Sequence, residues 1–216
     1  MIVIILRPQP GADATAARAR ALGLQIVVAP LFEIQPMAWI APDPAAFDAL
    51  LLTSASGVRA AGEKLMRFAH LPVVTVGEAT ADAARGAGLD VTQIGEGDGA
   101  SVVAASRYRH FVHLAGRRHV PLDSARVTSV AVYAAEALPP PKLPATGVAL
   151  LHSARAARRF GAIVHDRAAY ALVAISPGVA EAAGSGWRAV VSAGRPADAA
   201  MLAMAASLCE DPDHGV

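Results

Sequence analysis

The sequence is poor in cysteine and in charge. Cys209 is the only cysteine among 216 residues, which excludes an intrachain disulfide and any cysteine-rich metal site. Charged residues make up 17% of the chain and nearly cancel, with 19 Lys and Arg against 18 Asp and Glu and a formal net charge of +1. Such a balance provides no field for nucleic acid and no polybasic patch for a membrane surface. We therefore expect neither nucleic acid nor a membrane among its partners.

Long apolar runs are also missing. The N-terminus, MIVIILRPQPG, holds an apolar run of five residues with no basic region before it. A membrane span needs roughly 20 residues, and a signal peptide needs a basic start. We expect this segment to be the first strand of a cytoplasmic protein. The hydrophobic share of 54% is enough for a sizeable core in one large domain or two small ones.

Familiar catalytic and cofactor motifs are absent too. GEGDGAS at 95–101 lacks G-x-G-x-x-G spacing, LHSAR at 151–155 lacks the G-x-S-x-G elbow, and the seven histidines show no H-E-x-x-H pattern. We therefore expect no dinucleotide, no metal ion and no other cofactor. His113 lies inside an apolar strand, and we interpret it as a core histidine with satisfied hydrogen bonds.

What the chain does have is a series of short apolar segments that end in Gly, Ser or Pro, most of them followed by Ala- and Arg-rich helical segments. Their continuous hydrophobicity indicates strands covered on both faces, and the intervening helices indicate right-handed crossovers. The pattern predicts the α/β class with parallel sheets. The predicted strands are IVIILR, QIVVAPL, DALLLTS, PVVTVG, DVTQIG, HFVHLAG, SVAVYAAE, GVALLHS, ALVAIS and RAVVSAG.

The chain also repeats itself at a spacing of 99 residues. TSA at 53–55 is matched by HSA at 152–154, and GEATADAA at 77–84 is matched by SPGVAEAA at 176–183. Consecutive strand-turn-helix units in one register indicate an internal duplication.

The repeat extends upstream at slightly different spacings. VIILRP at 3–8 resembles FVHLAG at 111–116, 108 residues further on, and VVAPLFE at 27–33 resembles VAVYAAE at 130–136, 103 residues further on. The second copy has therefore lost five residues, which would shorten its helix. Two copies of a five-strand unit predict two similar domains.

Proline-bearing segments at matching places in the two copies suggest where the domains meet. They are APLFEIQPM at 29–37 and ALPPPKLPATG at 137–147. A simple tandem would divide the chain near residue 105, but these crossings favour a chain that leaves its first domain, builds the second and returns. We predict a discontinuous domain 1 of residues 1–33 plus 138–216, a domain 2 of 38–128, and linkers at 34–37 and 129–137.

Taken in order, the segments resemble the uroporphyrinogen-III synthase family. The resemblance covers nearly the whole chain and rests on LRP near the start, LLLTSASGVRA, VVTVGEATADAARGAG, the LAG turn at Gly116, VAVY, ALLHSARAARRF, VAISPGVAEAA and AGRPADAAMLAM. It implies two flavodoxin-like α/β domains joined by a two-stranded linker, the first of them discontinuous, with the substrate held between them.

The resemblance also implies an activity. Members of the family are lyases of tetrapyrrole and heme biosynthesis, which close hydroxymethylbilane to uroporphyrinogen III with loss of water and inversion of ring D. They use no cofactor or metal ion. Without an enzyme the bilane closes without inversion, so much of the catalysis is control of the substrate's conformation. A transient contact with the deaminase that supplies the bilane is also implied.

The same resemblance implies the site. Ligands of open parallel sheets bind beyond the carboxyl ends of the strands, and backbone N–H groups, hydroxyls and Arg suit the carboxylates of a bilane. Tyr133 matches the tyrosine of the family's return linker and is the candidate catalytic donor to the departing hydroxyl. The alternative is a tyrosine that only packs. Ser153 either contacts substrate or only caps a helix. The substrate-binding candidates are Arg7, Thr53, Ser54, Ser56, Gly77, Thr80, Gly116, Arg117, Ser153, Ala154, Arg155, Ser176, Pro177, Gly178 and Val179.

Two segments depart from the family pattern. The family often has GPTT where this chain has SPGV at 176–179, so both threonine hydroxyls are missing. After Gly116 the chain reads GRRHVPLD, where relatives commonly carry an acidic residue and a longer helix. Arg117 and Arg118 face either substrate propionates or solvent. The missing threonines keep an alternative open, a non-catalytic or impaired two-domain member of the family that binds a small anionic ligand.

Overall fold

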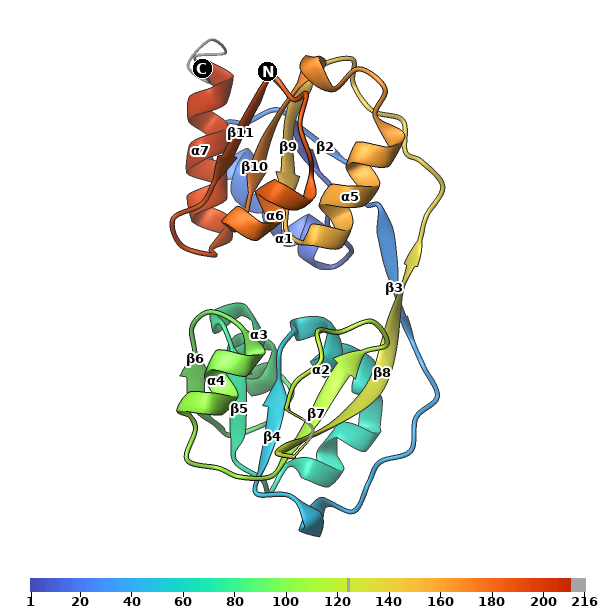
Figure 1. Cartoon of the computed structure of the whole chain (residues 1–216), viewed down its shortest axis with the longest axis vertical. Helices are drawn as coiled ribbons and strands as arrows, with labels where there is room; N and C mark the ends of the chain where they lie inside the picture. The colour runs from blue at the N-terminus through green and yellow to red at the C-terminus, as the bar shows by residue number, and fades with distance from the viewer. Residues whose placement is uncertain (124, 211–216) are drawn as a thin grey trace. The chain divides into compact units, whose positions relative to one another are not determined.

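The computed structural model describes residues 1–123 and 125–210, which form two sheets flanked by helices (Figure 1). All strand pairs within the two sheets are parallel except that between β3 and β8. The predicted α/β class with parallel sheets is confirmed. The strands are β1 Val3–Ile5, β2 Ile26–Val28, β3 Phe32–Pro36, β4 Ala49–Leu52, β5 Val73–Val76, β6 Val91–Gly95, β7 Phe111–Gly116, β8 Val127–Ala137, β9 Gly147–Leu151, β10 Tyr170–Ala174 and β11 Ala189–Ser192. The helices are α1 Gly11–Ala21, α2 Ala55–Ala61, α3 Glu78–Gly86, α4 Gly99–Ala105, α5 Ala154–Ile163, α6 Pro177–Ala182 and α7 Asp198–Glu210, with 3-10 segments η1 Pro44–Ala46, η2 Gly62–Phe68 and η3 Arg167–Ala169.

Contacts divide the chain into two compact units. Unit 1 comprises Met1–Glu33 and Ala137–Val216, and unit 2 comprises Ile34–Glu136. Most of the predicted second linker, 129–136, falls in unit 2, because β8 pairs with β7 as far as Tyr133. That the two units are independently folding domains stays a prediction.

The two sheets have the same spatial order of strands. The sheet of unit 1 runs β11-β10-β9-β1-β2, and the parallel part of the other runs β6-β5-β4-β7-β8. Under the 99-residue repeat β4, β5 and β6 correspond to β9, β10 and β11, and the upstream matches pair β1 with β7 and β2 with β8. In chain order, unit 1 has the flavodoxin-like order 2-1-3-4-5. Unit 2 has the same spatial arrangement, but its chain begins at β4, which corresponds to the third strand of unit 1. When its five parallel strands are numbered in chain order, their spatial order is 3-2-1-4-5.

Strand β3 adds an antiparallel edge to β8. Met37 N–H donates to Val132 O at 2.9 Å, and Leu138 N–H donates to Leu31 O at 3.1 Å. Residue numbers rise along one strand as they fall along the other, which is the antiparallel arrangement. The segment predicted as a linker at 34–37 therefore lies mostly within a strand.

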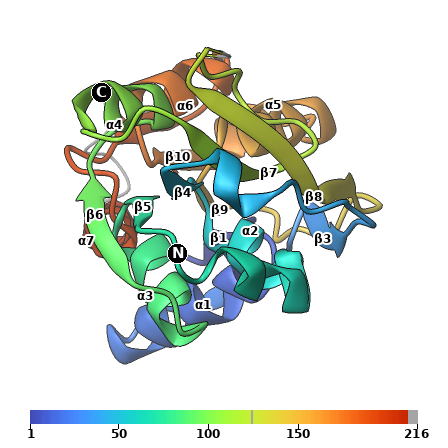
Figure 2. The same ribbon diagram turned by 90° about the horizontal axis from the view of Figure 1, so that it is seen from below.

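Helices cover both faces of each sheet (Figures 1 and 2). Buried apolar side chains hold them there. In unit 1, α1 and α7 pack on the face that carries Val3, Ile5 and Leu150, while α5 and α6 contact β9, β10 and β11. In unit 2, α2, η2 and α3 cover the face with Leu50 and Leu52, and α4 covers the face with Leu51 and Val74. Each five-strand copy thus has the same layers.

One helix of unit 1, α1, has no counterpart among the described residues of unit 2. By the 99-residue spacing α2, α3 and α4 correspond to α5, α6 and α7. The segment that corresponds to α1 is 117–126, and its described residues form turns and coil with no helix. The predicted shortened helix is therefore wrong for the described part of this segment. The lost residues, together with a proline at 121, leave too little chain between β7 and β8 for a helix to form.

Candidate functional site

A cavity of about 220 Å³ opens at the carboxyl ends of β4 and β7 in unit 2. Thr53, Ser54, Gly116 and Tyr133, all predicted from the sequence as site residues, line it together. The cavity lies where open parallel sheets bind ligands, and residues 118–122, which form no helix, contribute to its lining. The full lining is Thr53, Ser54, Gly99, His113, Gly116, Arg118, His119, Val120, Leu122 and Tyr133.

Tyr133 is held by a hydrogen bond at its hydroxyl and a close glycine beneath its ring. Tyr133 Oη lies 3.1 Å from Ser54 Oγ. A Cβ on Gly116 would lie 2.8 Å from the tyrosine Cζ, so only glycine leaves room for this ring. Ser54 Oγ also accepts the N–H of Gly57 at 3.1 Å as the N-cap of α2. With that lone pair engaged, the Ser54 proton is available to Tyr133, and the phenol proton is then available to a ligand.

His113 forms the buried wall of the cavity. Its Nε2 lies 2.9 Å from Thr53 Oγ1, and its Nδ1 lies 3.0 Å from Ser129 Oγ. Both ring nitrogens are therefore satisfied, which confirms the interpretation of His113 as a core histidine. Burial, with His119 nearby, lowers the pKa of His113 from 6.5 to about 4. The imidazole is thus neutral at pH 7, with one nitrogen as donor and the other as acceptor.

His119 was not singled out from the sequence. Its Nδ1 donates to the carbonyl of Gly116 at 2.9 Å, and its ring stands edge-on to His113 at 5.5 Å between centroids. Because a carbonyl only accepts, a neutral His119 carries its proton on Nδ1 and keeps a lone pair on Nε2. The only sequence signal for this residue was its place just after the Gly116 turn.

The two arginines after Gly116 differ in position. Arg117 was the predicted contact, but its Nη1 lies 3.6 Å from Glu136 and its backbone N–H donates to Tyr133 O at 2.7 Å. Arg118 lines the cavity instead. Of the two arginines that we expected to face either substrate propionates or solvent, Arg118 lines the cavity and Arg117 lies beside Glu136.

In unit 1, Arg7 belongs to a polar cluster centred on Asp198. Arg7 Nη1 lies 3.4 Å from Thr15 Oγ1 and 3.6 Å from Asp198 Oδ1. Asp198 also accepts from His152 Nε2 at 2.8 Å and from Arg18 at 2.6 Å. Burial by itself would raise the pKa of the Asp198 carboxyl, but the hydrogen bonds from His152 and Arg18 outweigh it and hold that pKa well below its usual range. Arg7 therefore already has a carboxylate of its own chain beside it.

The other predicted residues of β9 and α5 lie at the start of a helix. Ser153 Oγ accepts the N–H of Ala156 at 3.2 Å as the N-cap of α5, and Ala154 is the first residue of that helix. The capping role of Ser153 is thus present, and its ligand contact stays a prediction. The Arg155 guanidinium lies 4.1 Å from the centroid of the Phe32 ring, a cation–π contact.

The remaining predicted residues occupy the first turns of α6, α3 and α2. Ser176 is the N-cap of α6 without a side-chain capping bond, Pro177 opens the helix, Gly178 is exposed and Val179 is buried. Gly77 has φ 75° and precedes α3, a left-handed conformation that favours glycine. Thr80 is buried on α3, and Ser56 is half-buried on α2. For all of these residues, contact with a substrate stays a prediction.

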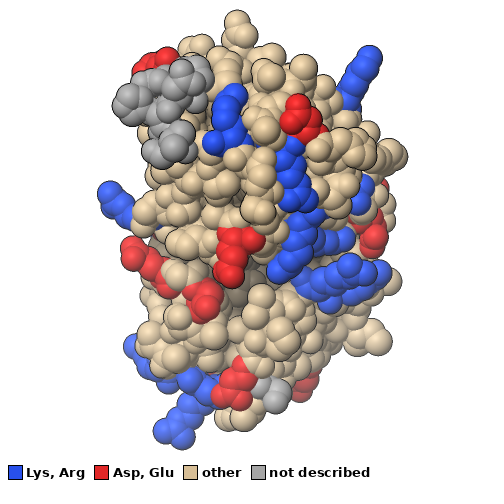
Figure 3. All heavy atoms as spheres, turned by 45° about the horizontal axis from the view of Figure 1, so that its top comes forward, with Lys and Arg blue, Asp and Glu red and all other residues tan. Residues whose placement is uncertain are grey.

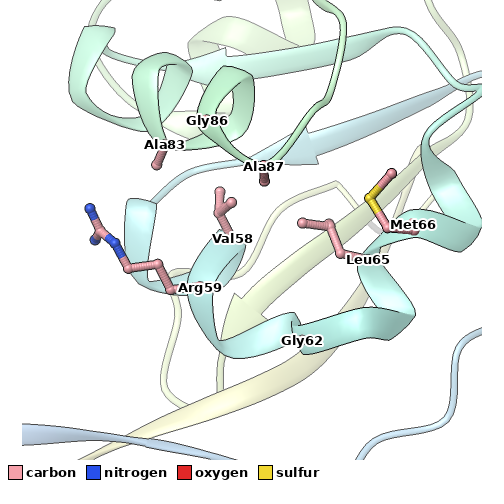
Figure 4. Close-up of a pocket in the computed structure, with 8 residues that line it drawn as sticks. All are labelled: Val58, Arg59, Gly62, Leu65, Met66, Ala83, Gly86 and Ala87. Carbon is pink, nitrogen blue, oxygen red and sulfur yellow. The ribbon is translucent and has the colours of Figure 1, made fainter.

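A larger and more open cavity of about 540 Å³ lies elsewhere in unit 2. In Figure 4, Ala83 of α3 and Ala87, the residue that caps its C-terminus, face Val58 of α2 and Leu65 of η2. Apart from Arg59 its lining is apolar, and it sits between helices rather than at strand ends. We therefore place the candidate site in the smaller cavity, which carries the polar groups.

Charged side chains of both signs are scattered over the face in Figure 3, between larger uncharged areas. Among residues 1–123 and 125–210, no three His, Cys, Asp or Glu side chains gather as a metal ion would require. No helix in the described part of the chain has the length and apolar character that crossing a membrane would take.

Comparisons with known proteins agree with one another. A family model described as Uroporphyrinogen-III synthase HemD matches residues 13–203. The crystal structure of a uroporphyrinogen-III synthetase from Helicobacter pylori is similar with a TM-score of 0.66 at 18% identity, over 96% of this chain and 100% of that one. A mutant uroporphyrinogen III synthase from Thermus thermophilus has a TM-score of 0.57 at 17% identity, over 98% and 100%. At these identities the likeness is one of fold. No curated protein sequence matches.

Proposed function

The chain belongs to the uroporphyrinogen-III synthase HemD family, and we propose on that basis that it is itself a uroporphyrinogen-III synthase, a hydro-lyase of tetrapyrrole biosynthesis. The observation that carries the proposal is the cavity at the ends of β4 and β7, where Tyr133, Ser54 and Thr53 come together. The substrate would be hydroxymethylbilane and the product uroporphyrinogen III.

The proposed reaction begins with loss of the ring-A hydroxymethyl oxygen as water, which leaves an electrophilic azafulvene. The far pyrrole ring attacks through its substituted carbon, and a spiro intermediate rearranges so that ring D closes inverted. Tyr133 is the candidate donor to the departing oxygen, because Ser54 can donate to the phenol oxygen and leave the phenol proton for the substrate. A hydroxyl donor assists this step without changing its own charge.

Most of the proposed catalysis is conformational. The bilane closes without inversion when it is free, so the protein has to hold the chain ends in the geometry that favours attack at the substituted carbon. The substrate-binding candidates at the strand ends of both units would hold its carboxylates. Support comes from their small hydroxyls, glycines and arginines at the ends where parallel sheets bind ligands.

We also propose that the two units are domains, with β3 and β8 as a two-stranded linker between them. The division of contacts and the shared strand order support this. We further propose that the protein is cytoplasmic and acts on a small-molecule substrate. We also propose that it makes a transient contact with the preceding deaminase.

A second candidate function is a non-catalytic or impaired family member that binds a small anionic ligand. The turn at Ser176, Pro177, Gly178 and Val179 favours it, because this turn offers one hydroxyl where relatives often have two threonines. Such a protein would keep the fold and lose the turnover.

The test supplies freshly made hydroxymethylbilane to the purified chain, oxidises the products and separates the porphyrin isomers. A synthase yields mainly isomer III, whereas a binding protein leaves the isomer I that forms spontaneously. Protein unfolded by heat serves as the control for the spontaneous reaction. Isomer I alone from the folded chain would refute the synthase proposal.

A further inference from the structure

The larger cavity of unit 2 (Figure 4) can be compared with the same place in unit 1, because the internal repeat pairs the helices around it. At the spacing of 99 residues α2 corresponds to α5 and α3 corresponds to α6. Gly62 and Gly86 line the cavity of unit 2, and their counterparts in unit 1 are Gly161 and Ser185. The comparison therefore joins equivalent points of two similar frameworks.

In unit 1 the side chain of Arg167 fills this place. Its Nη2 donates to the carbonyl of Gly161 at 2.7 Å, and its Nη1 donates to the carbonyl of Ser185 at 2.9 Å. A Cβ built on Gly186, the counterpart of the lining residue Ala87, would lie 3.8 Å from Arg167 Cδ. The arginine stem and its guanidinium thus contact the counterparts of three residues that line the cavity in unit 2.

In unit 2 the corresponding side chain is turned away. The counterpart of Arg167 is Phe68, which is fully buried in the core and stacks on Trp39 with 6.3 Å between ring centroids. In unit 1 the guanidinium also lies 5.2 Å from the centroid of the Trp187 ring, and Gly88 stands at that position in unit 2. Unit 2 therefore lacks both the arginine and the ring beneath it, and a cavity of about 540 Å³ remains between the helices.

The cavity offers groups that suit a guanidinium. The equivalent of the Ser185 carbonyl is that of Gly86, the last residue of α3. No group in the described part of the chain donates a hydrogen bond to it, and free carbonyls at the C-terminal end of a helix carry partial negative charge. Leu65 and Met66 supply an apolar wall, which suits the methylene stem of an arginine. Met66 is 51% exposed, so an occupant would cover it further.

Arg59 does not oppose a second cation at this place. It is the charged residue of the lining, but it is exposed, and in Figure 4 its side chain points away from Leu65 and Met66. Its counterpart in unit 1, Arg158, is exposed as well, and Arg167 lies between the helices all the same. Water and salt screen exposed charges, so the repulsion is weak.

We propose that the cavity between α2, η2 and α3 is a docking site for a partner protein, which inserts an arginine side chain where Arg167 lies in unit 1. Its volume of about 540 Å³ falls in the range of roughly 300–1,000 Å³ that holds whole ligands, which is more than one guanidinium fills. A segment of protein chain supplies both the arginine and apolar neighbours for the rest of the cavity. Arginine is also enriched among the residues that dominate protein interfaces. This inference does not rest on the proposed function.

The experiment is an NMR titration of the intact, isotope-labelled chain with the peptide acetyl-Leu-Arg-Leu-amide. The matched control is the same peptide with citrulline in place of arginine, which keeps the shape and removes the charge. The arginine peptide should shift the Met66 methyl signal and the amide signals of Gly86 and Ala87, and the citrulline peptide should shift them several-fold less. Equal shifts, or no shifts at the cavity, would overturn the proposal. Ethylguanidinium that binds as tightly as the peptide would make the occupant a small compound and overturn the protein partner.

Arg59→Gln tests the sign of the charge that the cavity binds. Removal of a nearby like charge should strengthen binding of the arginine peptide by about twofold to fivefold. An anion held by Arg59 would be the opposite case, so weaker binding of the arginine peptide in this variant would contradict the proposal. Because Arg59 is exposed, the variant should fold, and a thermal melt checks this.

Met66→Arg supplies a guanidinium at the cavity from the chain itself and should abolish binding of the arginine peptide. Met66→Gln, of similar length and without charge, is the matched control and should keep most of the binding. Equal binding by the two variants would count against the proposal. Met66 lies outside the candidate active site, so Met66→Arg should give the same porphyrin isomers as the unaltered chain, and either outcome of the isomer test leaves the docking site to be judged by the peptide alone.

Sedimentation equilibrium of the intact chain distinguishes a partner protein from a second copy. A molecular mass that does not depend on protein concentration agrees with a docking site for another protein. A dimer that the arginine peptide dissociates would make a second copy the occupant and would overturn the proposal.

Discussion

Among single residues, Tyr133 is the one at which a substitution should change turnover while leaving the packing of the protein nearly intact. Tyr133→Phe should lower isomer-III turnover by roughly tenfold to hundredfold, less than the largest losses seen when a donor to developing charge is removed, because the bilane already loses its hydroxyl without help. The phenyl ring of the variant still packs against Gly116. Loss of the hydrogen bond to Ser54 should lower the free energy of unfolding by only about 1 kcal/mol. Turnover and thermal melting are measured side by side. Tyr108→Phe is the control, since Tyr108 lies outside the cavity lining. Unchanged turnover in Tyr133→Phe would reduce Tyr133 to packing.

A second residue-scale prediction concerns His113 and pH. Its folded pKa is lowered to about 4 from 6.5, so between those values the unfolded chain binds a proton that the folded chain does not. Stability is therefore complete above pH 6.5 and falls as the pH drops toward 4, by roughly 3 kcal/mol in total. Denaturant unfolding of the intact chain across this range measures it. His113→Gln should flatten the slope, and an unchanged slope would assign the titration to other groups, His152 first among them, because its pKa is lowered as well.

At the scale of elements, Asp198 connects α1, α7 and the end of β9. Its carboxylate bonds Thr15 and Arg18 of α1 and His152 after β9. Asp198→Asn should lower the unfolding free energy by about 2 to 3 kcal/mol, at the low end for a broken buried pair because Arg18 is half exposed. Since the folded pKa is depressed, this contribution is present above the ordinary value of 3.8 and is lost at lower pH. Asp82→Asn, on the exposed surface of α3, should change stability by less than about 0.5 kcal/mol. Equal losses in the two variants would contradict the structural role of Asp198.

At the scale of the whole molecule, the boundary of unit 2 decides which excised chain folds. A fragment of residues 34–136 should unfold cooperatively, since it holds β4 to β7 and all of β8 except its last residue, and it has the size of a small domain. A fragment of 38–128, the predicted domain 2, should be far less stable, because it lacks the part of β8 that pairs with β7 through Tyr133. Circular dichroism melts compare them. An unfolded 34–136 fragment would show that the unit needs the rest of the chain.

The sequence predicted the α/β class, the duplication and most strands, but it failed for the segment after Gly116. Strands such as β4 are signalled by continuous apolar runs, and the pairing of β4 with β9 in the repeat is visible as matched letters. For residues 117–126 we predicted a shortened helix. The spacing of the repeat gives the number of residues in this segment, but it does not show whether they can form a helical turn. The resemblance implied a two-stranded linker that includes residues 34–37, but the pairing of β3 with β8 is given only by the structure, since it depends on a distant segment.

For the candidate site, the order and spacing of local segments were enough to predict the family, which the family model confirms, and the polar strand ends. Only the tertiary structure decided that Thr53, Ser54, Gly116 and Tyr133 share one cavity in unit 2 while Arg7 stands beside Asp198 in unit 1. It also decided the parts of His113, His119 and Arg118. The physical reason is distance along the chain: His113 meets Thr53 across 60 residues, and Tyr133 meets Ser54 across 79. Contacts of that span are set by the pairing of β4, β7 and β8, and the described residues between β7 and β8 form no helix. No local pattern encodes either feature.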